Sequence, residues 1–378
     1  MPKIIYRPNP SPPPFDPPTP PTPTANYLTF TAVEAGCRIT LRNRLSPDPV
    51  SIEYSLDGNT WQPLELSTPI TLENIGDSVK FRGINETISK DSTNYYYLYG
   101  EGKLSASGDV TSLLNGLGGD VAVPAYAFNH LFYASQNLLT PPNLPSLQLA
   151  EGCYSYMFMD CKALTTAPQL PATNLANRCY MCMFYDCKAL ASMPELPASV
   201  LYEYCYTSMF AGCLALTTTT TNMPVTTLAK SCMSSMFQGC TALEEVRFAL
   251  SCTTLFESCY KSMFSGCSAL LQAPALPATT LAKSCYSSMF TDCTSLTQAP
   301  ILPALNLVEN CYQYMFQGCT ALNYIKAMFT TTPSNTYTDY WVYRVAASGI
   351  FVKNVSASWD VTGNNGVPSG WTVETSTE

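Results

Sequence analysis

Apolar residues recur with a fixed period through the middle of the chain. The phrase Cys-Tyr-x-x-Met-Phe-x-x-Cys-x-x-Leu occurs seven times between Cys153 and Leu322, with Met233 replacing the tyrosine in one unit. Successive phrases are 26 or 27 residues apart, and Pro-x-Leu-Pro-Ala follows four of them. A fixed period of this length indicates a solenoid, in which each coil buries its apolar face against its neighbours.

Within each unit the apolar positions repeat at steps of four. Leu281, Cys285, Met289 and Cys293 have this spacing, which is typical of one face of an α-helix. The second half of a unit, for example residues 164–170, carries Thr, Ala and Leu and ends at a proline, as expected for a short strand. The pattern therefore predicts coils that each contain a short helix and a short strand, with the strands stacked in parallel.

The residues on either side of the seven units predict end caps. Shifting back by 26 residues from the first unit places Leu131 and Phe132 at the Met-Phe positions, which indicates a degenerate capping coil. We therefore expect the solenoid to span residues 127–334, with a cap coil and seven full repeats, and a β cap to span residues 335–378. The strands expected in that C-terminal cap are 341–345, 349–353 and 370–373. An open solenoid end would expose unpaired strand edges, so a cap is required.

The apolar pattern changes to strict alternation near the N-terminus. Six short strands are predicted there, at residues 28–33, 37–41, 50–54, 69–72, 79–81 and 95–98. Turn sequences such as Asp57-Gly58-Asn59 separate them. Regular spacing of this kind predicts a β-sandwich over residues 26–103, and the glycine-rich residues 104–126 are expected to connect it to the solenoid.

Residues 1–25 contain eleven prolines and form a separate, Pro-rich extended arm. One interpretation is a flexible linker. The other is an anchor that lies along another subunit, because a preformed extended segment loses little entropy on docking. The candidate anchoring residues are Pro12, Pro13, Pro14, Phe15, Pro17 and Pro18.

Composition narrows the range of partners. Only 12% of the residues are charged and the net charge is −8, which disfavours a nucleic-acid or anionic-membrane surface because phosphate binding needs clustered Lys and Arg. No run of 18 apolar residues exists, so no membrane insertion is expected. The first residues have neither an apolar signal region nor a lipid-accepting cysteine. Either an export signal was removed, or the protein is not exported by that route.

The chain has 17 cysteines, most of which recur with the coil period. An odd count and this periodicity favour reduced, buried cysteines that act as small hydrophobic residues. Disulfides within or between coils remain an alternative, although neighbouring coil positions need not meet the required geometry. A metal site is a further alternative, but the only Cys-x-x-Cys pair is Cys179 with Cys182. We expect no metal and no cofactor.

Residues for catalysis are scarce. His130 is the only histidine and is expected to be structural, so no catalytic dyad or triad that requires histidine can be assembled. Asp160, Asp186 and Asp292 recur after Met-Phe and are expected to be solvated turn residues and not a pair of glycosidase carboxylates. We therefore expect a protein that is not an enzyme, with no catalytic residues.

A tyrosine follows the first cysteine in six of the seven units. These residues are Tyr154, Tyr180, Tyr206, Tyr260, Tyr286 and Tyr312. They are expected to form a column along the solenoid, and aromatic rings with a hydroxyl suit sugars or protein partners. The alternative is that the rings pack between coils.

Two segments closely resemble the BspA-like leucine-rich repeat family. They are Ala-Pro-Ala-Leu-Pro-Ala-Thr-Thr-Leu at residues 273–281 and Cys-Tyr-Ser-Ser-Met-Phe-Thr-Asp-Cys-Thr-Ser-Leu at residues 285–296. The resemblance covers residues 127 to about 329 and implies a leucine-rich-repeat-like α/β solenoid. Together with the β-sandwich predicted from the alternating pattern and the end caps, this gives an expected α+β chain. Family members are surface adhesion proteins, and similar arrays occur in phage-encoded proteins.

The resemblance, taken with the missing export signal, favours a non-enzymatic virion appendage or decoration protein that is assembled in the host cytoplasm. Its Pro-rich arm would then contact other virion subunits, and its solenoid would contact a host surface glycan or protein. The alternative is a bacterial cell-surface adhesin whose export signal is missing from this sequence. Association with further copies of the same chain stays open.

Overall fold

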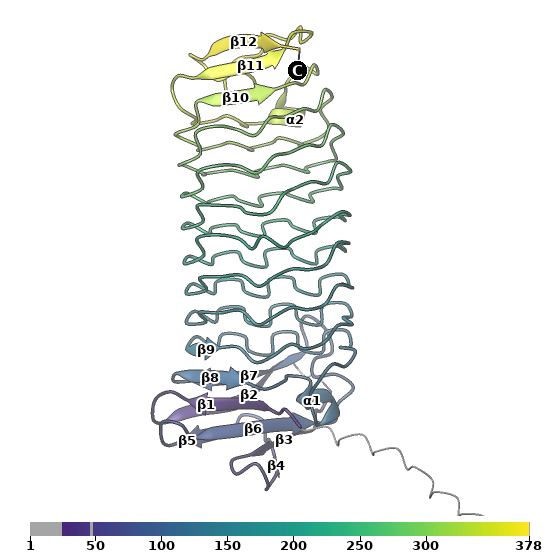
Figure 1. Ribbon diagram of the computed structural model, residues 1–378, viewed down its shortest axis with the longest axis vertical. Coiled ribbons are helices and arrows are strands. Elements are labelled where there is room, and N and C mark those ends of the chain that lie inside the picture. Colours follow the sequence, from purple (N-terminus) through teal and green to yellow (C-terminus); the bar gives the residue numbers. More distant parts are fainter. Residues whose placement is uncertain (1–24, 46–47, 378) are drawn as a thin grey trace, which may run out of the picture.

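The computed structural model describes residues 25–45 and 48–377. These residues form an elongated stack, with β-sheets at both ends and successive turns of backbone between them (Figure 1). Strands far outnumber helices, because the described residues contain only two helices of four residues each, α1 (Ser112–Asn115) and α2 (Asn335–Thr338). The candidate anchoring residues between positions 12 and 18 lie outside the described residues.

Two sheets lie at the N-terminal end. The strands of the larger sheet are β1 (Leu28–Ala32), β3 (Ile52–Ser55), β4 (Gln62–Pro63), β6 (Ser78–Gly83), β8 (Leu104–Ser107) and β9 (Leu138–Thr140). Those of the smaller sheet are β2 (Cys37–Arg44), β5 (Pro69–Leu72) and β7 (Tyr95–Glu101). Their orders are β4-β3-β6-β1-β8-β9 and β5-β2-β7, so both sheets are open. All neighbouring strands are antiparallel except β8 and β9.

Alternation of apolar residues explains these strands. In β1, Leu28, Phe30 and Ala32 are buried while the residues between them are half-buried, which is the two-residue period of a strand with one covered face. The six predicted strands coincide with β1, β2, β3, β5, β6 and β7. Strand β8 lies in the stretch expected as a connector, and it pairs with β9 from the first coil, so the sheet continues into the stack.

The repeats do not contain the predicted helices. In the unit of Cys285, backbone N–H groups alternate between two kinds of acceptor. Those of Tyr286 and Phe290 donate to carbonyl oxygens one coil further on, at 3.1 and 2.9 Å, while that of Met289 donates three residues back, to Tyr286, at 3.1 Å. Each coil is therefore a ribbon of tight turns that is hydrogen-bonded to its neighbour at every second residue. This corrects the expected α/β character of the solenoid.

Left-handed residues at every fourth position prevent a helix. Ser284, Ser288 and Asp292 have φ values of 55°, 56° and 58°. A right-handed helix cannot include such residues, because an L-residue there has a different backbone direction and a steric cost. The period of four that indicated a helix face is instead the length of the turn. Two residues of each turn, such as Met289 and Phe290, point into the stack and are buried.

The second half of each unit is extended, but it forms few regular strands. Neighbouring coils are joined there by isolated parallel bridges, such as Val200 with Thr227 and Thr254 with Thr280. Prolines in these segments have no N–H group to donate, so a continuous ladder cannot form. These bridges are parallel, as predicted. The strand predicted at residues 164–170 does not form.

A further coil without the sequence motif follows the last repeat. The N–H groups of Tyr312, Tyr314 and Phe316 donate to the carbonyl oxygens of Tyr337, Asp339 and Trp341, as they would to another repeat. The strand predicted at 341–345 is therefore wrong, because these residues belong to a coil of turns. The closing sheet is parallel and consists of β10 (Tyr324–Ala327), β11 (Ile350–Asn354) and β12 (Thr372–Ser376).

No helix in the described part of the chain is long and apolar enough to cross a membrane.

Candidate functional site

The tyrosines proposed as a ligand-binding column lie inside the stack. Tyr154, Tyr180, Tyr206, Tyr260, Tyr286 and Tyr312 are each 1–2% exposed. Their rings stack in near-parallel pairs, with centroid separations of 5.9 Å between Tyr154 and Tyr180 and 6.1 Å between Tyr286 and Tyr312. They form a column, as predicted, but its faces are covered by neighbouring coils. The alternative, packing between coils, is therefore the correct one, and these rings are not a ligand surface.

A second aromatic column runs beside the first. It consists of Phe132, Phe158, Phe184, Phe210, Phe237, Phe264, Phe290 and Phe316, one from each coil. Successive ring centroids are 5.3–5.8 Å apart and the rings are tilted by at most 18°. The coil spacing enforces this geometry, because each ring occupies the same place one coil higher. The repeated aromatic residues are thus explained by packing.

The second cysteine of every repeat has a defined hydrogen bond. Its Sγ donates to the carbonyl oxygen of the phenylalanine in the previous coil, for example Cys187 to Phe158 at 3.1 Å and Cys293 to Phe264 at 3.1 Å. The same bond occurs at Cys161, Cys213, Cys240, Cys267 and Cys319, with distances of 2.9–3.3 Å. The thiols therefore contribute a weak donor as well as apolar volume.

Burial makes these thiols poor nucleophiles. All cysteines except Cys182 are buried. Desolvation raises the pKa of Cys179 to about 12 and that of Cys285 to about 12, so the reactive thiolate is disfavoured. Cys182, half of the Cys-x-x-Cys pair, is partly exposed, and burial raises its pKa to about 11. Among the described residues, no group of three or more His, Cys, Asp or Glu side chains is arranged to hold a metal ion.

His130 lies at the junction between the N-terminal sheets and the stack. Its ring stacks between Tyr95, at a centroid distance of 3.9 Å, and Tyr156, at 4.6 Å, and its Nδ1 contacts Asn129 Oδ1. Burial, and to a smaller extent the positive charge of Arg44, lowers the pKa of His130 to about 3. A ring held neutral between two tyrosines fits the structural role expected from the sequence.

The recurring aspartates occupy left-handed turn positions. Asp160, Asp186 and Asp292 have φ values of 57–63°, and glycine occupies the equivalent position in the other four complete units. Asp and Gly are among the residues that accept this conformation most readily, so backbone geometry explains their recurrence. The three aspartates lie in turns of different coils, as predicted, but only Asp292 is exposed, whereas Asp160 and Asp186 are half-buried.

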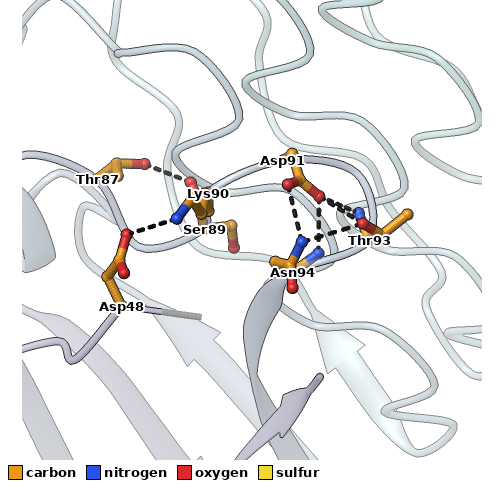
Figure 2. Close-up of polar contacts among 7 residues, drawn as sticks. All are labelled: Asp48, Thr87, Ser89, Lys90, Asp91, Thr93 and Asn94. Atoms are coloured by element: carbon orange, nitrogen blue, oxygen red, sulfur yellow. Dashed lines mark hydrogen bonds and ion pairs between the residues drawn. The ribbon is translucent and has the colours of Figure 1, made fainter. Parts of the chain in front are cut away.

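A polar loop after β6 shows a dense group of hydrogen bonds (Figure 2). Asp91 accepts hydrogen bonds from the backbone and side chains of Thr93 and Asn94 at 2.7–2.9 Å, which lowers the pKa of its carboxyl group. Lys90 pairs with Asp48 at 3.3 Å, and Ser89 Oγ donates to the carbonyl oxygen of Asn129 at 3.2 Å. The carboxylate of Asp91 is satisfied within its own loop, and the loop fastens the N-terminal sheets to the first coil.

Comparison with known proteins identifies the repeats. A model of the BspA type leucine-rich repeat region matches six copies, over residues 151–273 and 233–340. The two overlapping matches together span 190 of the 378 residues. No curated protein sequence matches the chain.

A similar solved structure is a leucine-rich cell surface protein from Faecalibacterium prausnitzii A2-165. It shares 15% sequence identity with the chain, with a TM-score of 0.24, and the alignment covers 75% of this chain and 94% of that one.

Proposed function

The chain belongs to the BspA-type leucine-rich repeat family, and from that premise we propose that it is a non-enzymatic adhesion or structural protein. The observation that supports this proposal best is the stack itself. The repeats place their tyrosines, phenylalanines and all but one of their cysteines inside, and turn residues such as Ser262 and Ser288 are half-buried at the outer side of the coil. A rigid stack with an extended outer surface suits the binding of a large partner better than the enclosure of a small substrate.

In this proposal the stack of coils is a leucine-rich-repeat solenoid and the two N-terminal sheets form a β-sandwich that spaces it from its attachment point. Attachment is through the Pro-rich residues 1–25, whose proline content lowers the entropy lost on docking. The solenoid then meets a glycan or a protein on a target surface.

We place this protein on a phage particle, as an appendage or decoration protein assembled in the host cytoplasm. A bacterial cell-surface adhesin is the alternative, and family membership fits it equally well. Antibodies against the chain test the two directly. They should detect the protein in purified particles if it is a virion component, and in the cell envelope if it is a bacterial adhesin. Recovery in the cytosolic fraction alone would contradict both.

Deleting residues 1–24 separates attachment from folding. The described core begins beside this segment, where the N–H of Asn26 donates to the carbonyl oxygen of Leu117, so the truncated protein should unfold at the same denaturant concentration as the full chain. It should no longer co-purify with particles or envelope. Equal incorporation of both forms would show that the arm is a passive spacer and would move the attachment surface to the N-terminal sheets.

A further inference from the structure

Tyrosines gather on the outer surface of the last two coils. Tyr340 is 44% exposed and Tyr343 is 39% exposed, and their rings are nearly perpendicular, with centroids 5.5 Å apart. Tyr314 occupies the equivalent position in the preceding coil, and the centroid of its ring lies 6.2 Å from that of Tyr340. We call these three residues the terminal tyrosine patch. Its rings form a corner with aromatic surface on two sides.

A tyrosine is unexpected at the position that Tyr340 occupies in its coil. It ends a row of left-handed residues that holds serine in four consecutive coils, at Ser208, Ser235, Ser262 and Ser288, and then tyrosine at Tyr314. Tyr340 itself has a φ of 47°. A bulky residue is disfavoured in this conformation, and an aromatic ring is disfavoured in water, so packing and backbone geometry both favour a small residue here.

The opposite end of the same row provides a comparison. Tyr156 also stands in the row in place of serine, but its ring is half-buried and stacks on His130, with the ring centroids 4.6 Å apart. No described residue covers Tyr340 and Tyr343 in this way, since both remain exposed. Packing against the N-terminal part of the chain therefore accounts for Tyr156, whereas the aromatic contacts of Tyr340 in the described part of the chain are only with Tyr314 and Tyr343, and its ring stays exposed.

A carboxylate with free bonding capacity borders the patch. Asp339 accepts a hydrogen bond from the hydroxyl of Tyr314 through Oδ2, at 3.1 Å, and its Oδ1 has no hydrogen-bond partner among the described residues. Asn365 Oδ1 accepts a hydrogen bond from the N–H of Tyr340 at 2.8 Å, which fixes the backbone under the ring. Arg344, which follows Tyr343 in the sequence, is exposed and forms no ion pair in the described part of the chain.

We propose that the terminal tyrosine patch binds a saccharide. A pyranose ring presents an apolar C–H face that packs on an aromatic ring, and its hydroxyl groups need nearby hydrogen-bond partners. The carboxylate of Asp339, which contacts Tyr314, supplies an acceptor, and Arg344 is an exposed donor next to Tyr343 in the sequence. The patch is open on its outer side, so it suits a sugar at the surface of a polymer or cell. This site deepens the adhesion function proposed above and rests on it.

The test uses the full-length chain on a microarray of defined neutral and acidic oligosaccharides. We expect binding to a subset of them, and at least a tenfold weaker apparent affinity for Tyr340→Ala and for Tyr343→Ala. Tyr202→Ala is the matched control, because Tyr202 is 45% exposed on a distant coil, and it should change affinity by less than twofold. Unfolding midpoints of all three variants establish that each one is folded. Binding to no oligosaccharide, or unchanged binding by both patch variants, overturns the proposal.

A second assay measures binding of the full-length chain to intact bacterial cells. It distinguishes failure of the saccharide site from failure of the proposed adhesion function. Binding that periodate treatment of the cells abolishes, and that Tyr343→Ala also loses, supports the saccharide site. Binding that protease treatment abolishes and periodate does not would mean that adhesion stands while the patch is not a sugar site. Binding to neither cells nor the array would contradict both proposals.

Discussion

The second cysteine of each repeat acts as a hydrogen-bond donor as well as a small apolar side chain. The phenylalanine carbonyl that it contacts already accepts a backbone N–H, as Phe264 does from Cys267 at 3.0 Å, and Cys293 of the next coil supplies the second partner. Buried carbonyl groups have two lone pairs, and satisfying both stabilises the folded state. A disulfide would remove the S–H donor, so this arrangement favours reduced thiols.

Removing one ring from the phenylalanine column should be costly. Phe290 is 0% exposed and stacks between Phe264 and Phe316, at 5.8 Å from each. Phe290→Ala is expected to lower the free energy of unfolding by about 3–5 kcal/mol, because it leaves a cavity that the stacked coils cannot close. Phe256→Ala, at a phenylalanine that is 42% exposed, is the control and should cost much less. Similar losses for both variants in denaturant titrations would refute the buried column.

His130 makes the junction with the N-terminal sheets sensitive to acid. Burial lowers its pKa from 6.5 to about 3, so the folded state resists protonation while the unfolded state accepts it. The contribution of neutral His130 to stability is complete above pH 6.5 and is lost as the pH falls from 6.5 towards 3, at roughly 1.4 kcal/mol per pH unit.

His130→Asn isolates this effect, because Asn tolerates the left-handed backbone at position 130, where φ is 61°, and does not titrate. Between pH 6.5 and 5 the free energy of unfolding should fall more steeply in the unmodified protein than in the variant. Parallel pH profiles would mean that another group governs acid sensitivity.

At the scale of the coil, stability comes from turns that repeat every four residues and are tied to the next coil. The left-handed residue of each turn directs the chain sideways, and this lets two consecutive side chains point inward. Inward pairs such as Met263 and Phe264 then meet the same pair of the next coil. A single coil could not bury these residues, so each depends on its neighbours.

Two serines in one coil test this turn geometry. Ser262 has a φ of 54° and Ser265 is not in the left-handed region, yet both are half-buried. Ser262→Gly should raise the free energy of unfolding by about 0.5 kcal/mol, because it removes the steric cost of a β-carbon in a left-handed residue. Ser265→Gly should lower it by about 0.5–1 kcal/mol, through the added entropy of the unfolded chain. If the coil were helical, both substitutions would destabilise it by similar amounts.

The sequence predicted which residues of the coil are buried more accurately than it predicted the backbone conformation of the coil. The recurrence of Met289 and Phe290 correctly placed them in the interior, because burial selects apolar residues whatever the local conformation. The same pattern suggested a helix, since a four-residue turn and a helix face share one period. Only the alternation of Asp and Gly at one position, as at Asp292 and Gly318, indicated left-handed residues. The tyrosine column failed as a site because periodicity reveals which residues stack but not which side of the coil they occupy.

At the scale of the whole molecule, the stack runs without interruption from the N-terminal sheets to the C-terminal sheet (Figure 1). Strand β9 joins the first coil to the sheet of β8, and β10 begins the parallel sheet that closes the other end. The coil that contains Trp341 extends the stack beyond the last recognisable repeat, which the sequence could not reveal because its cysteines are absent. These residues also carry the terminal tyrosine patch, so the missed coil and the missed candidate site have the same cause.

The central claim is that the repeated residues form a continuous buried interior, which leaves binding to the outer surface. Counting the thiols that an alkylating reagent reaches, by mass measurement, tests it most directly. In the native protein at most Cys182 should react, because the other 16 cysteines are buried. In denaturant without a reducing agent, all 17 should react. Rapid labelling of several cysteines in the native state, or fewer than 17 alkylated after denaturation, would contradict the buried, reduced ladder on which this account depends.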